Sequence, residues 1–305
     1  MPRPLNFRQI EAFRAVMQTG TTTAAAALLH TTQPSISRLL SQVQHATGLK
    51  LFDMHKGRLR ATQEARQLFE TVQRHFLGLE RIEQSVAVLR KSGAGSLHLG
   101  CTPALGLSVM PAVIHAFSLL HPDVHVNLQT IGTHALREGL LYGLFDVGVS
   151  TSAFHDAQLE EVSLHKANAV CVVHPGHALA HRASVHVRDL ARQVLLTLNA
   201  DDEIHQQFQR TLQEHGVECA STVETTYSAT ICMMAAKGTG VGIVNPYVAS
   251  VFARDLKILA LSPRCSAQVY MAFSPQSAPS SIAEQFVRLL KAHLQEFQLP
   301  RTRKK

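Results

Sequence analysis

The segment TTTAAAALLHTTQPSISRLL at residues 21–40 constrains the fold more than any other part of the chain. Its run of alanines favours a short helix, and such small side chains let a second helix approach closely. Thr31 or Thr32 can cap that second helix, with Pro34 in its first turn, where a missing backbone N–H costs nothing. The segment therefore predicts two short helices packed closely across a tight turn.

The second of these helices is expected to have one apolar stripe and one polar face. Its apolar residues recur at positions i, i+3, i+4 and i+7, which is the spacing of a single buried stripe. The stripe consists of Ile36, Leu39, Leu40 and Val43. The polar side chains that face away from it are Gln33, Ser37, Arg38, Ser41 and Gln44.

The neighbouring segments extend this pair of helices. Residues 5–18 repeat apolar side chains at helical spacing, and Gly20 ends that first helix. After Gly48, two short extended pieces surround Lys56 and Gly57, which predicts a small hairpin with basic residues at its tip. Three helices followed by a basic hairpin are typical of a winged helix-turn-helix.

The positive charge of the chain is concentrated in this first part. Residues 1–61 carry eight Lys and Arg side chains against Glu11 and Asp53, which is a net charge of +6 out of +7 for the whole chain. Because neutralising DNA phosphates releases bound counterions, a short basic domain is the footprint of a nucleic-acid binder. We therefore predict double-stranded DNA as a partner.

The polar face of the second helix is the predicted site of base recognition. Gln33, Ser37 and Arg38 are expected to reach base edges in the major groove, where Arg pairs with guanine and Gln with adenine. Lys56 and Arg58 on the hairpin would contact phosphates or the adjacent minor groove. The full predicted DNA-binding set is Thr32, Gln33, Pro34, Ser37, Arg38, Ser41, Lys56 and Arg58. The alternative is that this polar stripe is merely solvated.

A long polar helix is predicted over residues 62–91, before the linker sequence SGAGS at 92–96. Its apolar residues alternate at spacings of four and three, with His75 as a tolerated polar position. This heptad seam consists of Leu68, Val72, Leu79, Ile82, Val86 and Leu89. A seam of this kind on a connecting helix predicts dimerisation. The alternative is a helix that lies on its own domain.

Beyond this linker the pattern changes to short apolar strands that alternate with helical stretches. Nine strands are expected: LHLGC, VHVNLQT, DVGVS, AVCVV, VLLTL, STVET, GVGIV, KILAL and AQVYMAF. Strands separated by helices imply parallel sheets of the doubly wound kind. Nine strands in about 210 residues favour two α/β subdomains over one.

Motifs for other functions are weak in this part. KGTGVG at 237–242 follows a predicted helix and precedes a strand, the reverse of a dinucleotide fingerprint, so its glycines are interpreted as a helix stop. His174, His177 and His181 in HPGHALAH have no acidic or cysteine partners nearby, which favours a loop over a metal site. The chain has no GxSxG, HExxH or paired-carboxylate signature of a hydrolase. We expect no enzymatic activity, no cofactor and no metal.

Cysteine spacing and hydropathy indicate the compartment. The five cysteines are odd in number, widely spaced and without a CxxC pair, which argues against a disulfide framework and a zinc site. The chain has no apolar run near the roughly 20 residues needed to cross a bilayer, and its first residues contain no signal-peptide core. We expect reduced thiols, no membrane partner and a cytoplasmic location.

Taken together, these motifs resemble those of the LysR-type transcriptional regulators. NFRQIEAFRAVMQTG, TTTAAAALLHTTQPSISRLL and KGRLRATQEA carry the likeness at the start, and FDVGVS and VETTYSATICMMAAKGTGVGIVNP carry it later. The resemblance implies a winged helix-turn-helix at 1–61, a linker and dimerisation helix at 62–91, and a type 2 periplasmic-binding-protein-like effector domain at 92–305. Subdomain I would cover 92–165 and 267–305, and subdomain II would cover 166–266.

The resemblance also implies a mechanism. The two subdomains would clasp a small effector, and their closure would change how homodimers pair into a homotetramer and how sharply promoter DNA bends. RNA polymerase is a further candidate partner. Within the family, GLKLF, KGRLRAT and GVGIVNP resemble most the activator of the diaminopimelate decarboxylase gene, and EAFRAVMQTG is shared with octopine- and nopaline-sensing regulators.

This likeness implies an amino-acid-like effector, such as diaminopimelate or lysine, and a role as activator of lysine biosynthesis. One alternative is a regulator of opine, arginine or other amino-acid catabolism. An alternative from another class is a solute-binding α/β protein with an unrelated basic head.

Carried over from the family, the effector-binding residues lie at the carboxyl ends of strands, where open α/β sheets bind ligands. They are Thr102, Pro103, Thr133, Ser150, Thr151, Asn199, Asp202, Tyr227, Ser228 and Asn245. Hydroxyl groups and helix N-termini suit a carboxylate, and Asp202 suits an ammonium group. The alternative for each residue is a structural cap at the end of a strand.

Overall fold

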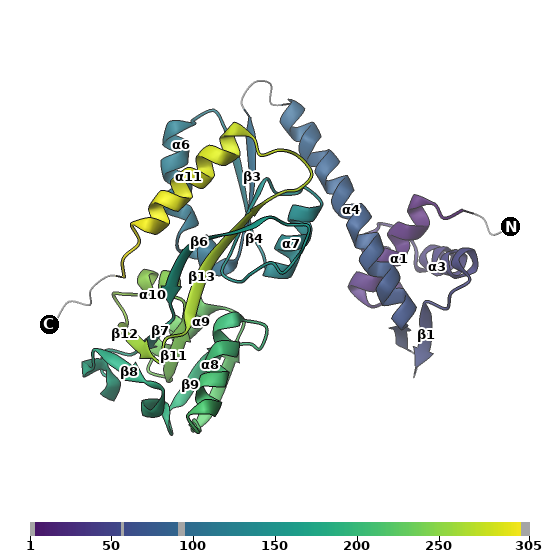
Figure 1. Cartoon of the computed structure of the whole chain (residues 1–305). Coiled ribbons are helices and arrows are strands. Elements are labelled where there is room, and N and C mark those ends of the chain that lie inside the picture. Colours follow the sequence, from purple (N-terminus) through teal and green to yellow (C-terminus); the bar gives the residue numbers. More distant parts are fainter. Residues whose placement is uncertain (1–3, 56–57, 91–94, 300–305) are drawn as a thin grey trace. The chain divides into compact units, whose positions relative to one another are not determined.

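The computed structural model describes residues 4–55, 58–90 and 95–299. The chain divides into two compact units, residues 1–86 and 87–305, and each is described by itself. The first unit is drawn in purple and blue in Figure 1, and the second in teal, green and yellow. Within the described residues, no helix is both long enough and apolar enough to span a membrane.

The first unit contains three short helices, a hairpin and the start of a long helix (Figure 1). The two strands of the hairpin pair antiparallel and form the wing. In chain order the elements are α1 (Phe7–Thr19), α2 (Thr22–Leu28), α3 (Gln33–Thr47), β1 (Phe52–His55), β2 (Arg58–Ala61) and α4 (Gln63–Arg90). This order confirms the predicted winged helix-turn-helix.

The three short helices pack around one apolar core. Ala25 and Ala26 of α2 are only 0% and 4% exposed, so the small alanine side chains do let the neighbouring helices pack closely against α2. Ile36 and Val43 of α3 are fully buried against the same cluster. Gly20 ends α1 in the left-handed conformation, with φ of 75°, which glycine adopts without a steric penalty.

The first half of α4 belongs to this same core. Val72 and Phe76 are buried in it, the guanidinium carbon of Arg14 lies 4.2 Å from the centre of the Phe76 ring, and the Arg14 Nε donates to Gln73 at 2.8 Å. Leu68 and Val72, the first two residues of the heptad seam, therefore pack on their own unit, which agrees with the alternative interpretation for this part of the helix. Farther along, Ile82 is 61% exposed. The side chains of Leu79, Val86 and Leu89 lie outside the described residues.

The second unit contains two β-sheets. The first sheet has five strands in the order β4-β3-β5-β13-β6. Its strands are β3 (Ser96–Cys101), β4 (His125–Thr130), β5 (Val147–Ser150), β6 (Glu161–Asn168) and β13 (Ser266–Phe273). The helices that follow its strands are α5 (Pro103–Leu107), α6 (Met110–Leu120), α7 (Thr133–Leu141) and α11 (Ser281–Gln295).

The second sheet has six strands in the order β10-β9-β11-β7-β12-β8. Its strands are β7 (Val170–Val173), β8 (Ser184–His186), β9 (Val194–Leu198), β10 (Ser221–Thr225), β11 (Val241–Val244) and β12 (Lys257–Ser262). The α-helices of this part are α8 (Glu203–Glu214), α9 (Ser228–Ala236) and α10 (Pro246–Val251). Two 3₁₀ helices, η1 (Ala178–His181) and η2 (Val187–Leu190), complete it.

Both sheets are mixed, which corrects the expectation of parallel sheets of the doubly wound kind. In the first, β13 runs antiparallel to β5 and β6, and in the second, β7 runs antiparallel to β11 and β12. The reason is connectivity: β6 leads directly into β7, and β12 leads directly into β13, so the chain passes between the sheets twice. The nine expected strands all form, together with β6 and β8, which the sequence did not indicate.

Each sheet has its own core. In the five-stranded sheet, Figure 1 shows α6 and α11 on one face and α7 on the other. The first face is filled by Leu97, Leu99 and Phe286. On the α7 face, Gly100 leaves room for the side chains of Leu136 and Phe145. The six-stranded sheet has an apolar cluster on each face, one around Phe208 and one around Ile231.

Gly240, in the KGTGVG motif, lies just before β11 at a point of close backbone approach. An added Cβ would overlap the carbonyl oxygen of Val194 and lie 3.1 Å from its carbonyl carbon. Val194 begins β9, which pairs with a strand on each side and cannot easily move. Both glycines of the predicted helix stop therefore have a structural reason. Gly238 adopts φ of +79°, and Gly240 allows the chain entering β11 to lie against the backbone of Val194.

We predict that Gly240→Ala destabilises the second unit by about 1–3 kcal/mol, the usual cost of an added methyl group where the structure is already packed. Gly132→Ala is the matched control, because its Cβ would meet nothing within 4 Å and its φ of −68° suits alanine. Thermal unfolding of the full chain measures the effect. Equal melting temperatures for the two variants would contradict it.

Candidate functional site

The outer face of α3 carries the side chains that the sequence assigned to base recognition. Gln33 and Arg38 are exposed, and Ser37 is half-buried. The Gln33 Nε2 donates to Ser37 Oγ at 2.9 Å and to Thr22 Oγ1 of α2 at 3.2 Å, so α2 helps to hold it. Within the described part of the chain, Arg38 makes no hydrogen bond or ion pair. A long, exposed cation of this kind is available to an external acceptor.

The remaining residues of the predicted DNA-binding set are placed as follows. Thr32 is the N-cap of α3, but its hydroxyl pairs with Ser35 Oγ at 2.8 Å and does not cap the helix. Pro34 is exposed in the first turn, and the exposed Ser41 donates to the Ser37 carbonyl at 3.1 Å. Lys56 lies outside the described residues. Arg58 begins β2, and its side chain also lies outside them.

Gln44 corrects one expectation. The sequence placed it on the outward polar face, but its Oε1 accepts hydrogen bonds from the backbone of Leu51 at 2.8 Å and of Phe52 at 3.2 Å. Leu51 is fully buried, so its amide needs an internal acceptor. Gln44 therefore fixes the start of the wing relative to α3. Nothing in the local pattern separates such a residue from a solvated one.

Four hydroxyl groups predicted to bind the effector meet at the carboxyl ends of β3 and β5. Thr102 Oγ1 lies 3.5 Å from Thr151 Oγ1 and accepts from the Thr151 amide at 3.3 Å. Thr133 Oγ1, at the start of α7, lies 3.3 Å from Ser150 Oγ. Pro103 begins α5 beside them. The fold thus assembles these groups from positions up to about 50 residues apart.

In the six-stranded part, Ser228 and Asn245 are brought together. Both are buried, and the Asn245 Nδ2 donates to Ser228 Oγ at 3.4 Å. The Asn245 Oδ1 also accepts from the Val248 amide at 2.9 Å and so caps α10. Asn245 is therefore a structural cap whatever else it does.

The other three predicted residues of this part stand apart from that pair. Asp202 caps α8 by accepting from the amides of Ile204 and His205 at 2.8 and 3.2 Å, and burial raises the pKa of its carboxyl group. Tyr227 precedes α9 and is 52% exposed, and Asn199 is half-buried after β9. Within the described contacts, no hydrogen bond joins these three side chains to Ser228 or Asn245.

One hydrogen bond between the two subdomains was not anticipated. Glu203, the first residue of α8, accepts from the amide of Ala153 at 2.7 Å, and Ala153 lies in the loop after β5. Within the six-stranded part, another polar contact joins Thr197 Oγ1 of β9 to His205 Nδ1 of α8 at 3.1 Å, and both residues are buried. The sequence could have indicated Glu203 only as an acidic residue in the first turn of a helix that follows a strand.

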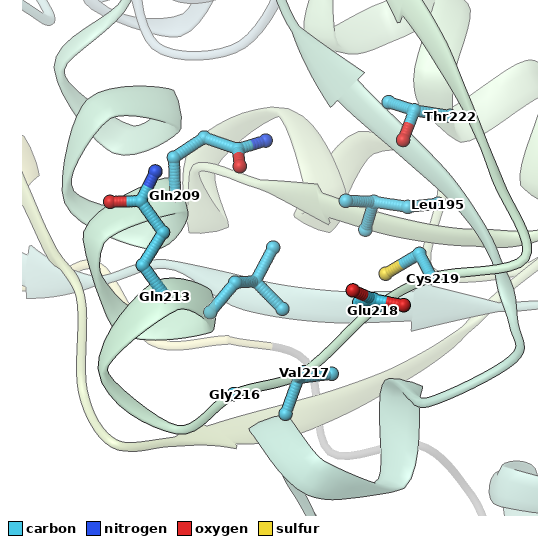
Figure 2. A pocket seen from close by; sticks show the side chains of 9 residues that line it. Leu195, Gln209, Gln213, Gly216, Val217, Glu218, Cys219 and Thr222 are labelled. Atoms are coloured by element: carbon cyan, nitrogen blue, oxygen red, sulfur yellow. The ribbon is translucent and has the colours of Figure 1, made fainter.

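A pocket of about 340 Å³ lies elsewhere, between α8 and the segment that leads into β10 (Figure 2). Gln209 and Gln213 of α8 form one wall, and Glu218 and Cys219 form the other. Its lining contains none of the predicted effector residues. The pocket and the strand-end hydroxyls are therefore distinct features of the second unit.

The cysteines are free thiols, and two histidines of the segment HPGHALAH hold a turn together. All five cysteines are free thiols, and burial raises the pKa of Cys101 to about 11 and of Cys171 to about 12. His174 Nδ1 accepts from the Gly176 amide at 3.0 Å, and His177 Nδ1 accepts from the Leu179 amide at 3.1 Å. These ring nitrogens stabilise a turn.

A basic winged helix-turn-helix joined to a pair of α/β subdomains is the fold of a DNA-binding transcriptional regulator with an effector-binding domain. Residues 7–66 match the family described as "Bacterial regulatory helix-turn-helix protein, lysR family", and residues 90–295 match "LysR substrate binding domain". The chain belongs to the LysR family. The two matches together exclude a solute-binding protein with an unrelated basic head. They also identify a regulator and not an enzyme.

Individual relatives support this assignment. The regulatory protein NocR of Agrobacterium fabrum is 38% identical over 248 residues, which cover 81% of this chain and 83% of NocR. The transcriptional activator protein LysR of Escherichia coli is 36% identical over 249 residues, covering 82% of this chain and 80% of LysR. Full-length CbnR, solved in complex with its target DNA, shares the fold with a TM-score of 0.68 at 22% identity, covering 95% of this chain and all of CbnR.

We predict that Gln44→Ala loosens the wing, because the buried Leu51 amide loses its acceptor at a cost of about 1–3 kcal/mol. Hydrogen exchange of the full chain should become faster at residues 51–61. Gln18→Ala is the control, since Gln18 is exposed and has no hydrogen-bond partner within the described residues. Unchanged exchange in the wing of Gln44→Ala would contradict this role.

Proposed function

We propose that this LysR-family regulator senses a small molecule with the carboxylate and ammonium groups of an amino acid. The observation that carries the proposal is the meeting of the hydroxyls of Thr102, Thr133, Ser150 and Thr151 at the ends of β3 and β5. Hydroxyl donors at strand ends suit a carboxylate. Asp202 and Tyr227, at the start of helices in the other subdomain, would receive the ammonium group and side chain.

Two physiological roles fit such an effector. The first is activation of lysine biosynthesis in response to diaminopimelate, and the 36% identity to LysR of Escherichia coli supports it. The second is regulation of opine, arginine or other amino-acid catabolism, which the likeness of EAFRAVMQTG to opine-sensing regulators supports. Which amino acid binds best decides between them.

DNA recognition would use the outward face of α3. Gln33, Ser37 and Arg38 would contact base edges, and Thr32, Pro34 and Ser41 would lie against the backbone or the groove wall. Lys56 and Arg58 would add phosphate contacts from the wing. The guanidinium of Arg38, which has no partner among the described residues, supports this assignment most directly.

The active form would be a homodimer or homotetramer. The exposed Ile82 on α4 supports pairing through the second half of that helix, because an apolar stripe there needs a partner. Such an assembly would act on promoter DNA in the cytoplasm, with RNA polymerase as its further partner.

We predict that Arg38→Ala weakens binding to a promoter fragment selected with the wild-type protein by about 1–3 kcal/mol, the value of a good base contact. Arg254→Ala removes the same charge from an exposed site in the second unit and serves as control. Fluorescence anisotropy over a salt series measures both, and the wild-type affinity should fall steeply with salt. Equal affinities for the two variants would refute the α3 assignment.

Calorimetry tests the effector class. Diaminopimelate, L-lysine, L-arginine, octopine and nopaline are titrated into the full chain, and at least one should bind. Ser150→Ala should then weaken binding about tenfold, since a hydrogen bond to a charged group contributes roughly 1.5–3 kcal/mol. Ser163→Ala, on β6 outside the cluster, should not. If no amino acid or opine binds, the effector class is wrong.

A further inference from the structure

The loop that follows β5 presents a row of backbone amides to oxygen acceptors. The Thr151 amide donates to Thr102 Oγ1 at 3.3 Å, and the Ser152 amide donates to Ser150 Oγ at 3.0 Å. The next amide, of Ala153, donates to Glu203 Oε1 at 2.7 Å, and that of Phe154 donates to Glu161 Oε2. Backbone amides directed at oxygen acceptors in this way can also donate to the oxygens of a bound anion.

Two of these acceptors are carboxylates, and one of them comes from the other subdomain. Glu161 belongs to β6 of the five-stranded sheet, whereas Glu203 begins α8 beside the six-stranded sheet. The 2.7 Å distance to the Ala153 amide is typical of a charge-assisted hydrogen bond. The contact therefore links the two subdomains through a charged group, in addition to the bond of 2.7 Å between His165 Nδ1 of β6 and the Tyr247 hydroxyl of α10.

Two further polar side chains lie near Glu203. The His155 Nε2 lies 3.8 Å from the same Oε1 atom, on the loop that the carboxylate contacts. Tyr270 of β13 is also nearby, and burial together with the charges of Glu203 and Glu161 raises the pKa of its phenol. Tyr270 is paired with Ser150 in the sheet, so this carboxylate lies close to the predicted effector hydroxyls.

We propose that Glu203 is a latch between the two subdomains. Its carboxylate accepts the hydrogen bond of the Ala153 amide, which the carboxylate of an amino-acid effector would otherwise accept. The latch opens when the effector displaces Glu203 from this amide. The inference rests on the proposed function for the nature of the effector. The protein carboxylate and the effector carboxylate have the same chemistry and would compete for the same amide row. Releasing Glu203 removes one of the bonds between α8 and the five-stranded part, and the bond from the Ser266 amide of β13 to Gln207 Oε1 of α8, at 2.9 Å, remains.

The test compares Glu203→Ala and Glu203→Gln with Glu214→Ala in the full chain. Glu214 is the last residue of the same helix, is exposed and has no partner within the described residues. Calorimetry uses diaminopimelate, L-lysine, L-arginine and octopine as probes. A latch closed in about nine molecules of ten lowers the apparent affinity about tenfold. Glu203→Ala should therefore bind about tenfold more tightly than wild type, and Glu203→Gln should fall between them.

Other results overturn the latch. Weaker binding by Glu203→Ala would mean that Glu203 contacts the ligand itself, and unchanged binding would mean that the contact is incidental. If no probe binds to wild type or variants, the effector class fails separately, and hydrogen exchange decides the latch. Exchange should then become faster both in residues 151–157 and in the first turn of α8 in the two Glu203 variants. Rates equal to those of Glu214→Ala would refute it.

Discussion

The DNA-binding unit depends on which face of α3 is buried and which face is exposed to solvent. Ile36 and Val43 are fully buried near the two ends of the helix, against α1 and α2. Burying such an aliphatic side chain contributes roughly 1.5–3 kcal/mol, well above what an exposed polar contact contributes. The apolar stripe therefore decides which side faces outward, and Gln33 and Arg38 lie on that side.

The effector-binding unit depends on a different constraint, which is where its strands end. Ligand groups in open α/β sheets gather at the carboxyl ends of strands. Ser150 at the end of β5 and Thr102 just after β3 meet there because the two strands pair side by side. The chain passes between the sheets twice, through β6–β7 and β12–β13.

Elements whose sequence repeats apolar side chains could be predicted, even where the folded strand is not buried. The α3 stripe and the nine strands have such repeats, and β4 and β10 among them contain only exposed or half-buried residues. β6, with the sequence EVSLHKAN, has few apolar side chains and gives little signal. The direction of β7 depends on where the chain arrives from the other sheet, which no local pattern encodes. The bond between Glu203 and Ala153 spans 50 residues and two subdomains, so only the folded chain reveals it.

Footprinting of the full chain on a selected promoter fragment, with and without diaminopimelate or L-lysine, tests both DNA recognition by α3 and its modulation by an amino-acid effector. We expect a protected operator whose extent changes when the effector is added, and loss of the protection in Arg38→Ala. A footprint that is absent, or that is the same for the wild type and Arg38→Ala, would contradict this expectation.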